Sequence, residues 1–284
     1  MNSGYWAEGD DAGNVLDMRT PNVARMFDYY LGGKDNLAVD RVAAVKVLTA
    51  APQVPRAARE NSDFVTRVIQ FLTEEKHVEQ FIDIGPGLPT NHNVHDIAHR
   101  YHKYARVAYV DHDPVVLAHG RALLARKHPL VTMIDGDLRE PDKILADPEL
   151  ERLIDLGQPV ALCLTLVLHF IPDRDGPHEI VARLLDRLTP NSYLVISHVT
   201  GDDKNPDIIT AVTDTYNQAT APLVMRSRAE VRRFFGECAM APPGVVYLTQ
   251  WYRYLVAEPV LALAAHYIDY LRHLVIRATV QFSR

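Results

Sequence analysis

The sequence predicts an α/β fold built around a mostly parallel sheet. From residue 78 onward, short apolar runs rich in β-branched residues alternate with helical stretches, which is the pattern of βαβ units. The short runs are almost wholly apolar, as expected for strands that helices cover on both faces. A chain of 284 residues has room for one large domain of this kind with small appendages.

The first part of the chain is predicted to be helical. The spacing of apolar residues predicts helices over residues 23–31, 38–50 and 60–73, and Gly32-Gly33 ends the first of them. Residues 1–20 are acidic and lack an apolar core, so we expect a flexible leader there rather than a secretion signal. The predicted organisation is therefore a leader at 1–20, a helical segment at 21–76 and the main domain at 77–284.

The elements of the main domain follow in alternation. Strands are expected at 80–84, 106–110, 131–134, 160–164 and 193–197, with helices at 93–102, 114–126, 141–150 and 177–188. Beyond residue 200 we expect helices at 206–219 and 228–235, a sixth strand at 245–250 and an amphipathic helix at 259–271. The closing segment IRATVQF fits either a continuation of that helix or a seventh strand.

Composition and charge narrow the class of partner. The 30 basic and 36 acidic residues are interleaved, which disfavours nucleic acid because a binder of phosphates normally has a basic face. The longest apolar stretch, residues 159–170, is shorter than the ~20 residues that span a bilayer. Cys163 and Cys238 lie far apart and outside any metal-ligand spacing. We therefore expect a reduced, cytoplasmic protein with no nucleic-acid and no membrane partner; its oligomeric state stays open.

A glycine loop follows the first predicted strand. Asp83, Gly85 and Gly87 form a D-x-G-x-G motif, in which the absent side chains let a ligand approach the backbone. Pro89 stands where a dinucleotide-binding fingerprint requires further glycine spacing, so G-x-G-x-x-G is not present. The motif alone is also compatible with a simple turn.

Acidic residues end the next two strands. Asp111 follows the glycine loop at roughly the ~20-residue spacing at which a carboxylate reaches a ribose. Asp113 suits the N-cap of the following helix, a role that Asp111 could also fill. The third strand runs into DGDL, where Asp137 is either an acceptor for an adenine amino group or a turn residue. Because the carboxyl ends of parallel strands gather at one edge, the three loops together predict a nucleoside site.

These motifs resemble a known pattern. D-x-G-x-G at 83–87, Asp111, and DGDL at 135–138 resemble the first three cofactor motifs of class I S-adenosylmethionine-dependent methyltransferases. The string PNVARMFDYYLGGKDNLAVDR at 21–41 resembles the N-terminal signature of an actinobacterial family of S-adenosyl methyltransferases. VDHDPVVLAHGRALL, LVLHFIPD and SYLVISHVT extend this similarity over about residues 20–251.

The resemblance implies a Rossmann-like sheet of about seven strands, with the helical cap at 21–76 over the cofactor S-adenosylmethionine and a cofactor-binding domain at 77–284. It implies that the methionine part faces Asp83, Gly85 and Gly87, the ribose faces Asp111, the adenine faces Asp137 and Leu138, and the sulfonium lies near Thr165. The chain departs from the family after Trp251, where it inserts AEPVLALAAHYIDYLRHL before the final strand.

Methyl transfer needs an aligned acceptor, and a base where the acceptor carries a proton. His169 follows the fourth strand and is the candidate general base; a structural hydrogen bond is the alternative. Arg25 and Tyr29 are expected to line the mouth of the site, whereas Asp40 and Arg41 are expected to form a structural pair.

Other side chains carry weaker expectations. His198 and Trp251 are further candidates for the rim, although tryptophan is more typical of a core or interface. His92, His95, His99 and His102 are spaced along one predicted helix, but no nearby acid or cysteine completes a metal site. We expect a solvated helix face there and no metal.

The predicted function is a methyltransferase that uses S-adenosylmethionine and acts on an unidentified small-molecule acceptor. A sensor that binds the cofactor without turnover is the alternative. An NAD-dependent oxidoreductase is disfavoured by the missing third glycine and by the helices that precede the first strand.

Overall fold

The computed structural model of the protein describes residues 17–90, 92–125, 128–202, 204–251 and 275–282. Its centre is a sheet in which five strands run parallel in the spatial order β3-β2-β1-β4-β5. These strands are β1 (Gln80–Ile84), β2 (Arg106–Asp111), β3 (Val131–Asp135), β4 (Ala161–Thr165) and β5 (Tyr193–Thr200). The predicted α/β fold with a parallel sheet is confirmed.

Three further strands extend the sheet beyond β5. The long strand β8 (Val275–Phe282) pairs antiparallel with β5, and it carries the two-residue strands β6 (Ala239–Met240) and β7 (Val246–Tyr247). The described sheet thus has eight strands where the sequence predicts about seven. The closing segment is a strand and not a helix, whereas the helix predicted at 259–271 and most of the predicted leader lie outside the described residues.

Ten α-helices stand among the described residues. They are α1 (Val23–Leu31), α2 (Ala38–Ala50), α3 (Val54–Glu74), α4 (Val94–Tyr101), α5 (Pro114–Gly120), α6 (Pro141–Leu145), α7 (Pro148–Leu153), α8 (Pro177–Leu185), α9 (Pro206–Tyr216) and α10 (Arg228–Arg233). Arg121–Ala125 continues α5 as a π-helix, and short 3₁₀ turns cover Leu168–Phe170, Asp173–Asp175 and Leu248–Gln250.

Prolines explain two differences from the predicted helices. The helix predicted at 141–150 is divided into α6 and α7, because Pro148 lacks the N–H that a continuing helix needs and Asp147 caps a new one. Helix α3 begins at Val54, earlier than predicted, because a proline in the first turn costs a helix no hydrogen bond. The strand predicted at 245–250 is shorter, since a 3₁₀ turn follows β7.

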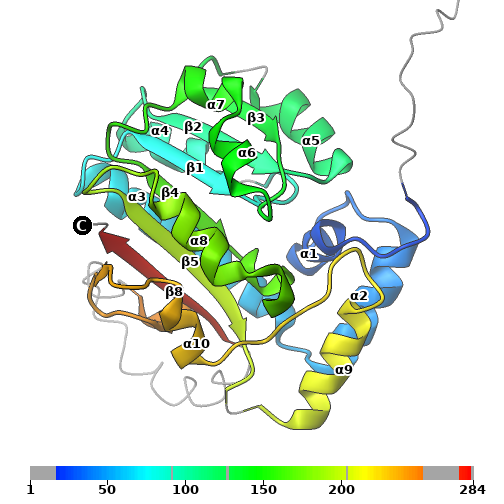
Figure 1. Ribbon diagram of the computed structural model, residues 1–284. Helices are drawn as coiled ribbons and strands as arrows, with labels where there is room; N and C mark the ends of the chain where they lie inside the picture. Colours follow the sequence, from blue (N-terminus) through cyan, green and yellow to red (C-terminus); the bar gives the residue numbers. More distant parts are fainter. Residues whose placement is uncertain (1–16, 91, 126–127, 203, 252–274, 283–284) are drawn as a thin grey trace, which may run out of the picture.

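Helices cover both faces of the sheet (Figure 1). Alternate side chains of each strand point to opposite faces, so Phe81 of β1 belongs to an apolar cluster with residues of α3, α4 and α5. Ile82 belongs to a second cluster with residues of α6, α7, α8 and α10. Among the described residues, no helix has the length and apolar character that crossing a bilayer requires.

A third apolar cluster joins α1, α2 and α9, which lie together beside the sheet in Figure 1. Met26 and Ala44 are fully buried in this cluster, and Val212 brings in α9 from far along the chain. The strand order puts β1 next to β4, which is where the direction of the chain connections reverses. In sheets of this type, ligands bind outside the carboxyl ends of the strands at that point.

Candidate functional site

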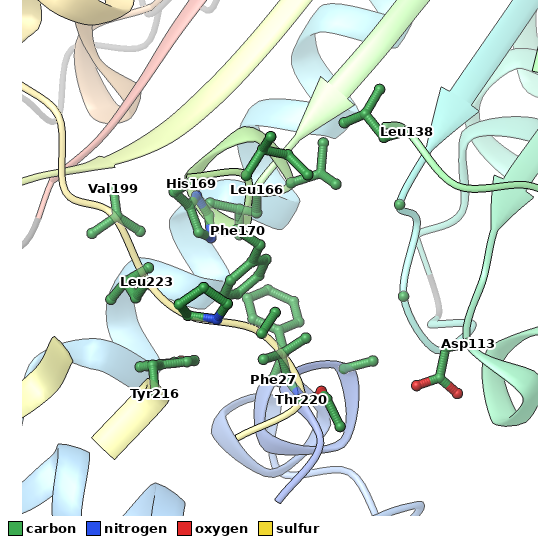
Figure 2. Close-up of a pocket in the computed structure, with 18 of the residues that line it drawn as sticks. Phe27, Asp113, Leu138, Leu166, His169, Phe170, Val199, Tyr216, Thr220 and Leu223 are labelled. Carbon is green, nitrogen blue, oxygen red and sulfur yellow. Dashed lines mark hydrogen bonds between the residues drawn. The ribbon is translucent and has the colours of Figure 1, made fainter. Parts of the chain in front are cut away.

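A cavity of about 440 Å³ opens at the carboxyl ends of β1 to β4. This size lies within the ~300–1,000 Å³ of small-molecule sites. One side of the cavity is formed by the loops after β1, β2 and β3, and the other by α1, α3, α9 and residues 220–225. Figure 2 shows Asp113 and Leu138 on one side of the open space, with Phe27, Tyr216 and Leu223 on the other.

The glycine loop needs its glycines. Gly85 and Gly87 both have positive φ angles, +72° and +69°, and both line the cavity. A Cβ atom on Gly85 would lie 2.5 Å from Cγ2 of Val167, which follows β4. The Gly85 N–H donates to the Val110 carbonyl oxygen at 2.8 Å. The loop is therefore held between the ends of β2 and β4.

Asp83 lies at the end of β1, behind the loop and outside the cavity lining. Its side chain is buried, and Oδ1 has no hydrogen-bond partner among the described residues. Burial, and to a lesser degree the negative charge of Asp111, raise the pKa of Asp83 to about 7. This carboxyl group can therefore change charge near neutral pH when a cation comes close.

Asp111 lines the cavity at the end of β2. Its Oδ1 accepts from the Asp113 N–H at 3.0 Å and its Oδ2 accepts from the Gly87 N–H at 3.4 Å. Burial raises the pKa of Asp111 even though these hydrogen bonds oppose the shift. Asp113 is the N-cap of α5, since its Oδ1 accepts from the Val115 N–H at 2.8 Å. The predicted cap at Asp113 is confirmed.

The loop after β3 completes this side of the cavity. Leu138 and Asp137 line it, and Thr165 adds the end of β4. Asp137 is paired with Arg139, whose Nη2 lies 2.5 Å from Oδ2. Burial acts to raise the pKa of Asp137, but the Arg139 hydrogen bonds outweigh it and hold the pKa below its usual value. The structure thus brings Gly85, Gly87, Asp111, Asp137, Leu138 and Thr165 together, with Asp83 behind them.

Helix α1 presents a different face to the cavity from the one expected. Val23, Phe27 and Tyr30 line it, at the i, i+4, i+7 spacing of one helix face. Arg25 and Tyr29 are not among the lining residues. That helical spacing in residues 21–41 is the signal that could have identified the lining side chains.

Arg25 instead makes a buried ion pair with Asp40, with 2.6 Å between Nε and Oδ2. The expected pairing of Asp40 with Arg41 is wrong, because Arg41 donates to the Asn36 carbonyl oxygen at 2.8 Å. Asn22 donates its backbone N–H to Asp40 at 2.8 Å, and its side-chain amide contacts Asp113. These bonds join α1 to α2 and to the loop after β2.

His169 lines the cavity from the short turn that follows β4 (Figure 2). The side chain is only 3% exposed, and Nδ1 has no partner among the described residues. Burial, with smaller effects from His198 and Arg226, holds the pKa of His169 well below the ordinary value. The imidazole is therefore neutral at neutral pH, so it can accept a hydrogen bond but is a weak base.

Arg226 anchors the segment that carries His169. Its guanidinium is buried and donates to the carbonyl oxygens of Leu168 at 2.9 Å and Ile171 at 2.8 Å, and to Oδ1 of Asp173 at 2.6 Å. The Nη1 of Arg226 also lies 3.2 Å from Nε2 of His198. The sequence holds no local motif for this residue, because all these partners are distant along the chain.

The remaining predicted rim residues lie in the core. His198 is fully buried behind His169, with 5.4 Å between ring centroids, and is not part of the lining. Trp251 is also fully buried and packs edge-on against Phe64 and Phe71, at centroid distances of 5.5 and 5.8 Å.

The histidines of α4 do not form a solvated face as expected. His95 is buried, and its Nδ1 lies 2.8 Å from the Tyr109 hydroxyl, while Nε2 of His99 lies 2.8 Å from the Ala105 carbonyl oxygen. Within the described ranges, no group of three or more side chains is arranged to hold a metal ion.

Comparisons with known proteins agree with this geometry. A family model described as S-adenosyl methyltransferase matches residues 10–265. A crystal structure of a DUF574 family protein from Streptomyces avermitilis is 33% identical, covers 94% of this chain and 99% of its own, and superposes with a TM-score of 0.84. A candidate methyltransferase from Thermobifida fusca is also 33% identical, with coverages of 97% and 100% and a TM-score of 0.83. No curated protein matches the sequence.

Proposed function

This chain belongs to the S-adenosyl methyltransferase family, and we propose that it transfers a methyl group from S-adenosylmethionine to a small-molecule acceptor inside the cavity. The family and its cofactor S-adenosylmethionine follow from the comparisons. The observation that supports the rest is the joining of a polar, glycine-lined edge and an apolar compartment in one cavity. The polar edge suits the cofactor, and the apolar compartment beside it suits a second molecule.

The proposed cofactor contacts use the strand ends. The backbone at Gly85 and Gly87 lets the methionine part approach closely, and Asp83 behind it offers a negative charge. Asp111 would accept hydrogen bonds from the ribose hydroxyls, because its carboxylate stands at the cavity wall. We propose the adenine against Asp137 and Leu138 and the sulfonium near Thr165. Asp137 would then have to share its oxygens with Arg139.

The chain's own contribution to the reaction is alignment and exclusion of water. When bound, S-adenosylmethionine supplies a methyl group on a sulfonium that is already activated toward nucleophiles. Helices α1 and α3, which belong to the proposed cap at 21–76, close one side of the cavity. His169 would accept a hydrogen bond from the acceptor and so orient its lone pair toward the methyl group. Its depressed pKa makes it an orienting group first and a base second.

The alternative is a sensor that binds the cofactor without turnover. The apolar compartment beside the strand ends favours turnover, since a pure sensor of the cofactor would not need a second binding space. The free cysteines, of which Cys163 is buried, are compatible with the reducing cytoplasm that we propose as the location.

Calorimetry tests the cofactor proposal directly. Titration with S-adenosylmethionine should give saturable binding, whereas NAD should give none. Absence of binding by S-adenosylmethionine would overturn the proposal. Turnover is tested by incubating the protein with the methyl-labelled cofactor and a broad panel of metabolite extracts; label in no product across that panel would favour the sensor.

A further inference from the structure

We infer that the methyl acceptor is an uncharged aromatic molecule that carries a hydroxyl group. It binds in the part of the cavity that we call the acceptor end, lined by Phe27, Tyr30, Phe170, Tyr216, Leu223 and Met225. This inference rests on the proposed function and adds the class of the substrate to it.

Charge is distributed unequally along the cavity wall. The ionisable carboxylates and guanidinium groups of the described lining come from the strand ends, such as Asp111 and Arg139, and from the 3₁₀ turn with Arg174 and Asp175. The lining from α1, α2, α3, α9 and residues 220–225 contains no Asp, Glu, Lys or Arg. A buried charge without a partner is strongly unfavourable. The acceptor end is therefore unsuited to carboxylates, phosphates and protonated amines.

Aromatic rings dominate the acceptor end. The rings of Phe170 and Tyr216 lie 5.8 Å apart between centroids, with 39° between their planes. Figure 2 shows Phe27 beside them at the same open space. Rings at such distances pack well against a flat partner, in offset or edge-on contact. Met225 adds an adaptable apolar side chain.

The tyrosine hydroxyls at this end are already engaged with each other. Tyr216 donates to the Tyr30 hydroxyl at 3.4 Å. Burial raises the pKa of Tyr216 to about 12, so the phenol stays neutral. These two residues therefore add polar surface but no charge.

His169 supplies the hydrogen-bond acceptor that a hydroxyl group needs. Its ring lies 4.3 Å from that of Phe170 between centroids, and its Nδ1 is buried without a partner among the described residues. Nδ1 is shielded from the cavity, so an acceptor hydroxyl would donate to the other ring nitrogen, Nε2, which a neutral imidazole can present as a hydrogen-bond acceptor.

The reaction at this position balances without another reagent. A lone pair of the hydroxyl oxygen forms the new O–C bond to the methyl carbon while the C–S bond breaks, and its electron pair neutralises the sulfonium. The hydroxyl proton passes to the imidazole of His169 and from there to water. The products are a methyl ether and the demethylated cofactor.

A series of naphthalene derivatives whose substituents differ in charge tests the inference. The protein is saturated with S-adenosylhomocysteine and titrated with 2-naphthol, 2-naphthoate and 2-naphthylmethylammonium. We expect 2-naphthol to bind at least tenfold more tightly than either charged analogue, and to yield its methyl ether when S-adenosylmethionine replaces the product cofactor. Phenol and a three-ring phenanthrol extend the series in size. Binding of a charged analogue as tight as that of its neutral partner would overturn the inference, as would failure of all three hydroxyl compounds to bind.

A variant can invert the preference. Met225 is half-buried at the acceptor end, and Met225→Lys places a cation there on an unbranched chain of similar length. We expect the ratio of the affinity for 2-naphthoate to the affinity for 2-naphthol to rise at least tenfold in this variant. Leu123→Lys, at a residue that is 48% exposed and outside the cavity lining, should leave the ratio unchanged. If Met225→Lys does not fold, Phe27→Lys tests the same point from α1; an unchanged ratio in the folded variant would count against the inference.

Titration with S-adenosylmethionine alone separates the two proposals. If the wild-type protein does not bind S-adenosylmethionine, the proposed function is overturned. Normal cofactor binding together with a preference for charged rings would overturn only the acceptor class.

Discussion

The two ends of the cavity are built in different ways. The end at the strands, which we call the cofactor end, is polar, and three consecutive βα loops form it around Gly85, Asp111 and Asp137. The acceptor end is apolar and is assembled from α1, the turn after β4, α9 and residues 220–225. The difference teaches that one end of a cavity can follow from the ends of successive strands, whereas the end beside it depends on contacts between segments that are distant in the chain.

The two ends are also held in shape by different interactions. Backbone hydrogen bonds link the loops of the cofactor end, as from the Gly136 N–H to the Asp111 carbonyl oxygen at 3.0 Å. The acceptor end depends on side-chain packing and on Arg226, which binds the turn after β4. Substitutions should therefore separate the two ends in measurable ways.

Arg226→Ala should have the largest effect on stability and should act on the acceptor end. Removal of the guanidinium takes away buried hydrogen bonds to the carbonyl oxygens of Leu168 and Ile171, although the Leu168 oxygen keeps the Ile171 N–H as a second donor. We therefore expect the free energy of unfolding to fall by about 3 kcal/mol. Urea denaturation measures the loss. Arg228→Ala, at an exposed neighbour, should change stability by less than ~0.5 kcal/mol.

The same variant should affect ligand binding differently at the two ends of the cavity. At temperatures where Arg226→Ala is folded, its affinity for S-adenosylmethionine should stay within about threefold of the wild-type value, because Arg226 does not line the cofactor end. Each ~1.4 kcal/mol of binding free energy corresponds to a tenfold change in the dissociation constant. An equal loss of cofactor and naphthol binding would show that the two ends are not independent.

Gly85→Ala should disturb both ends at once. The positive φ angle costs about 1–2 kcal/mol for a residue with a Cβ, and the clash with Val167 adds about 1–2 kcal/mol. Gly87→Ala is the matched comparison: φ is also positive, but the nearest atom to the new Cβ is that of Ala24 at 4.0 Å, so only the first cost applies. Thermal and urea unfolding of the two variants would show equal losses if the contact with Val167 carried no weight.

Asp111→Ala should weaken binding at the cofactor end and leave binding at the acceptor end unchanged. Loss of a ribose hydrogen bond to a carboxylate corresponds to about 1.5–3 kcal/mol, or roughly 10–150-fold in the dissociation constant of S-adenosylmethionine. Asp135→Ala is its control, because Asp135 is the register partner of Asp111 on β3 but is exposed and outside the lining. Calorimetry that finds similar losses in the two variants would argue against the ribose contact.

The smallest effect should be a pH dependence of native stability and of cofactor affinity that arises at Asp83. The pKa of this carboxyl is raised to about 7, so its contribution to native stability is present below pH 3.8 and is lost as pH rises to about 7. A cationic cofactor favours the ionised form and lowers this pKa. Affinity for S-adenosylmethionine should therefore rise with pH up to about 7 and then level off.

Asp83→Asn should flatten that rise, whereas Asp135→Asn should keep it, in calorimetric titrations between about pH 5.5 and 8.5. A rise that survives unchanged in Asp83→Asn would place its origin at another group.

Prediction from sequence succeeded where the cause is local. The span of β1 and the cap at Asp113 follow from residues within a few positions of each other. The gathering of Gly85, Gly87 and Asp111 follows from one rule, that parallel strands bring their carboxyl ends to a common edge. The break between α6 and α7 could also have been read from Pro148.

Prediction failed where packing decides. Helix α1 was located correctly, but its rotation about its own axis depends on Asp40 of α2, which captures Arg25 and turns Phe27 and Tyr30 to the cavity. The burial of His95 depends on Tyr109 of the neighbouring strand.

The sequence by itself determined the α/β class, the strands and the cofactor end, because glycine spacing and strand-terminal acids act over short stretches of chain. Only the tertiary structure decided the acceptor end. Its walls come from α1 and α9, which lie far apart in the chain and meet in one apolar cluster, and Arg226 reaches back to the turn that carries His169. Contacts of that kind leave no spacing in the sequence, since burial and the pairing of distant groups select them only once the chain is folded.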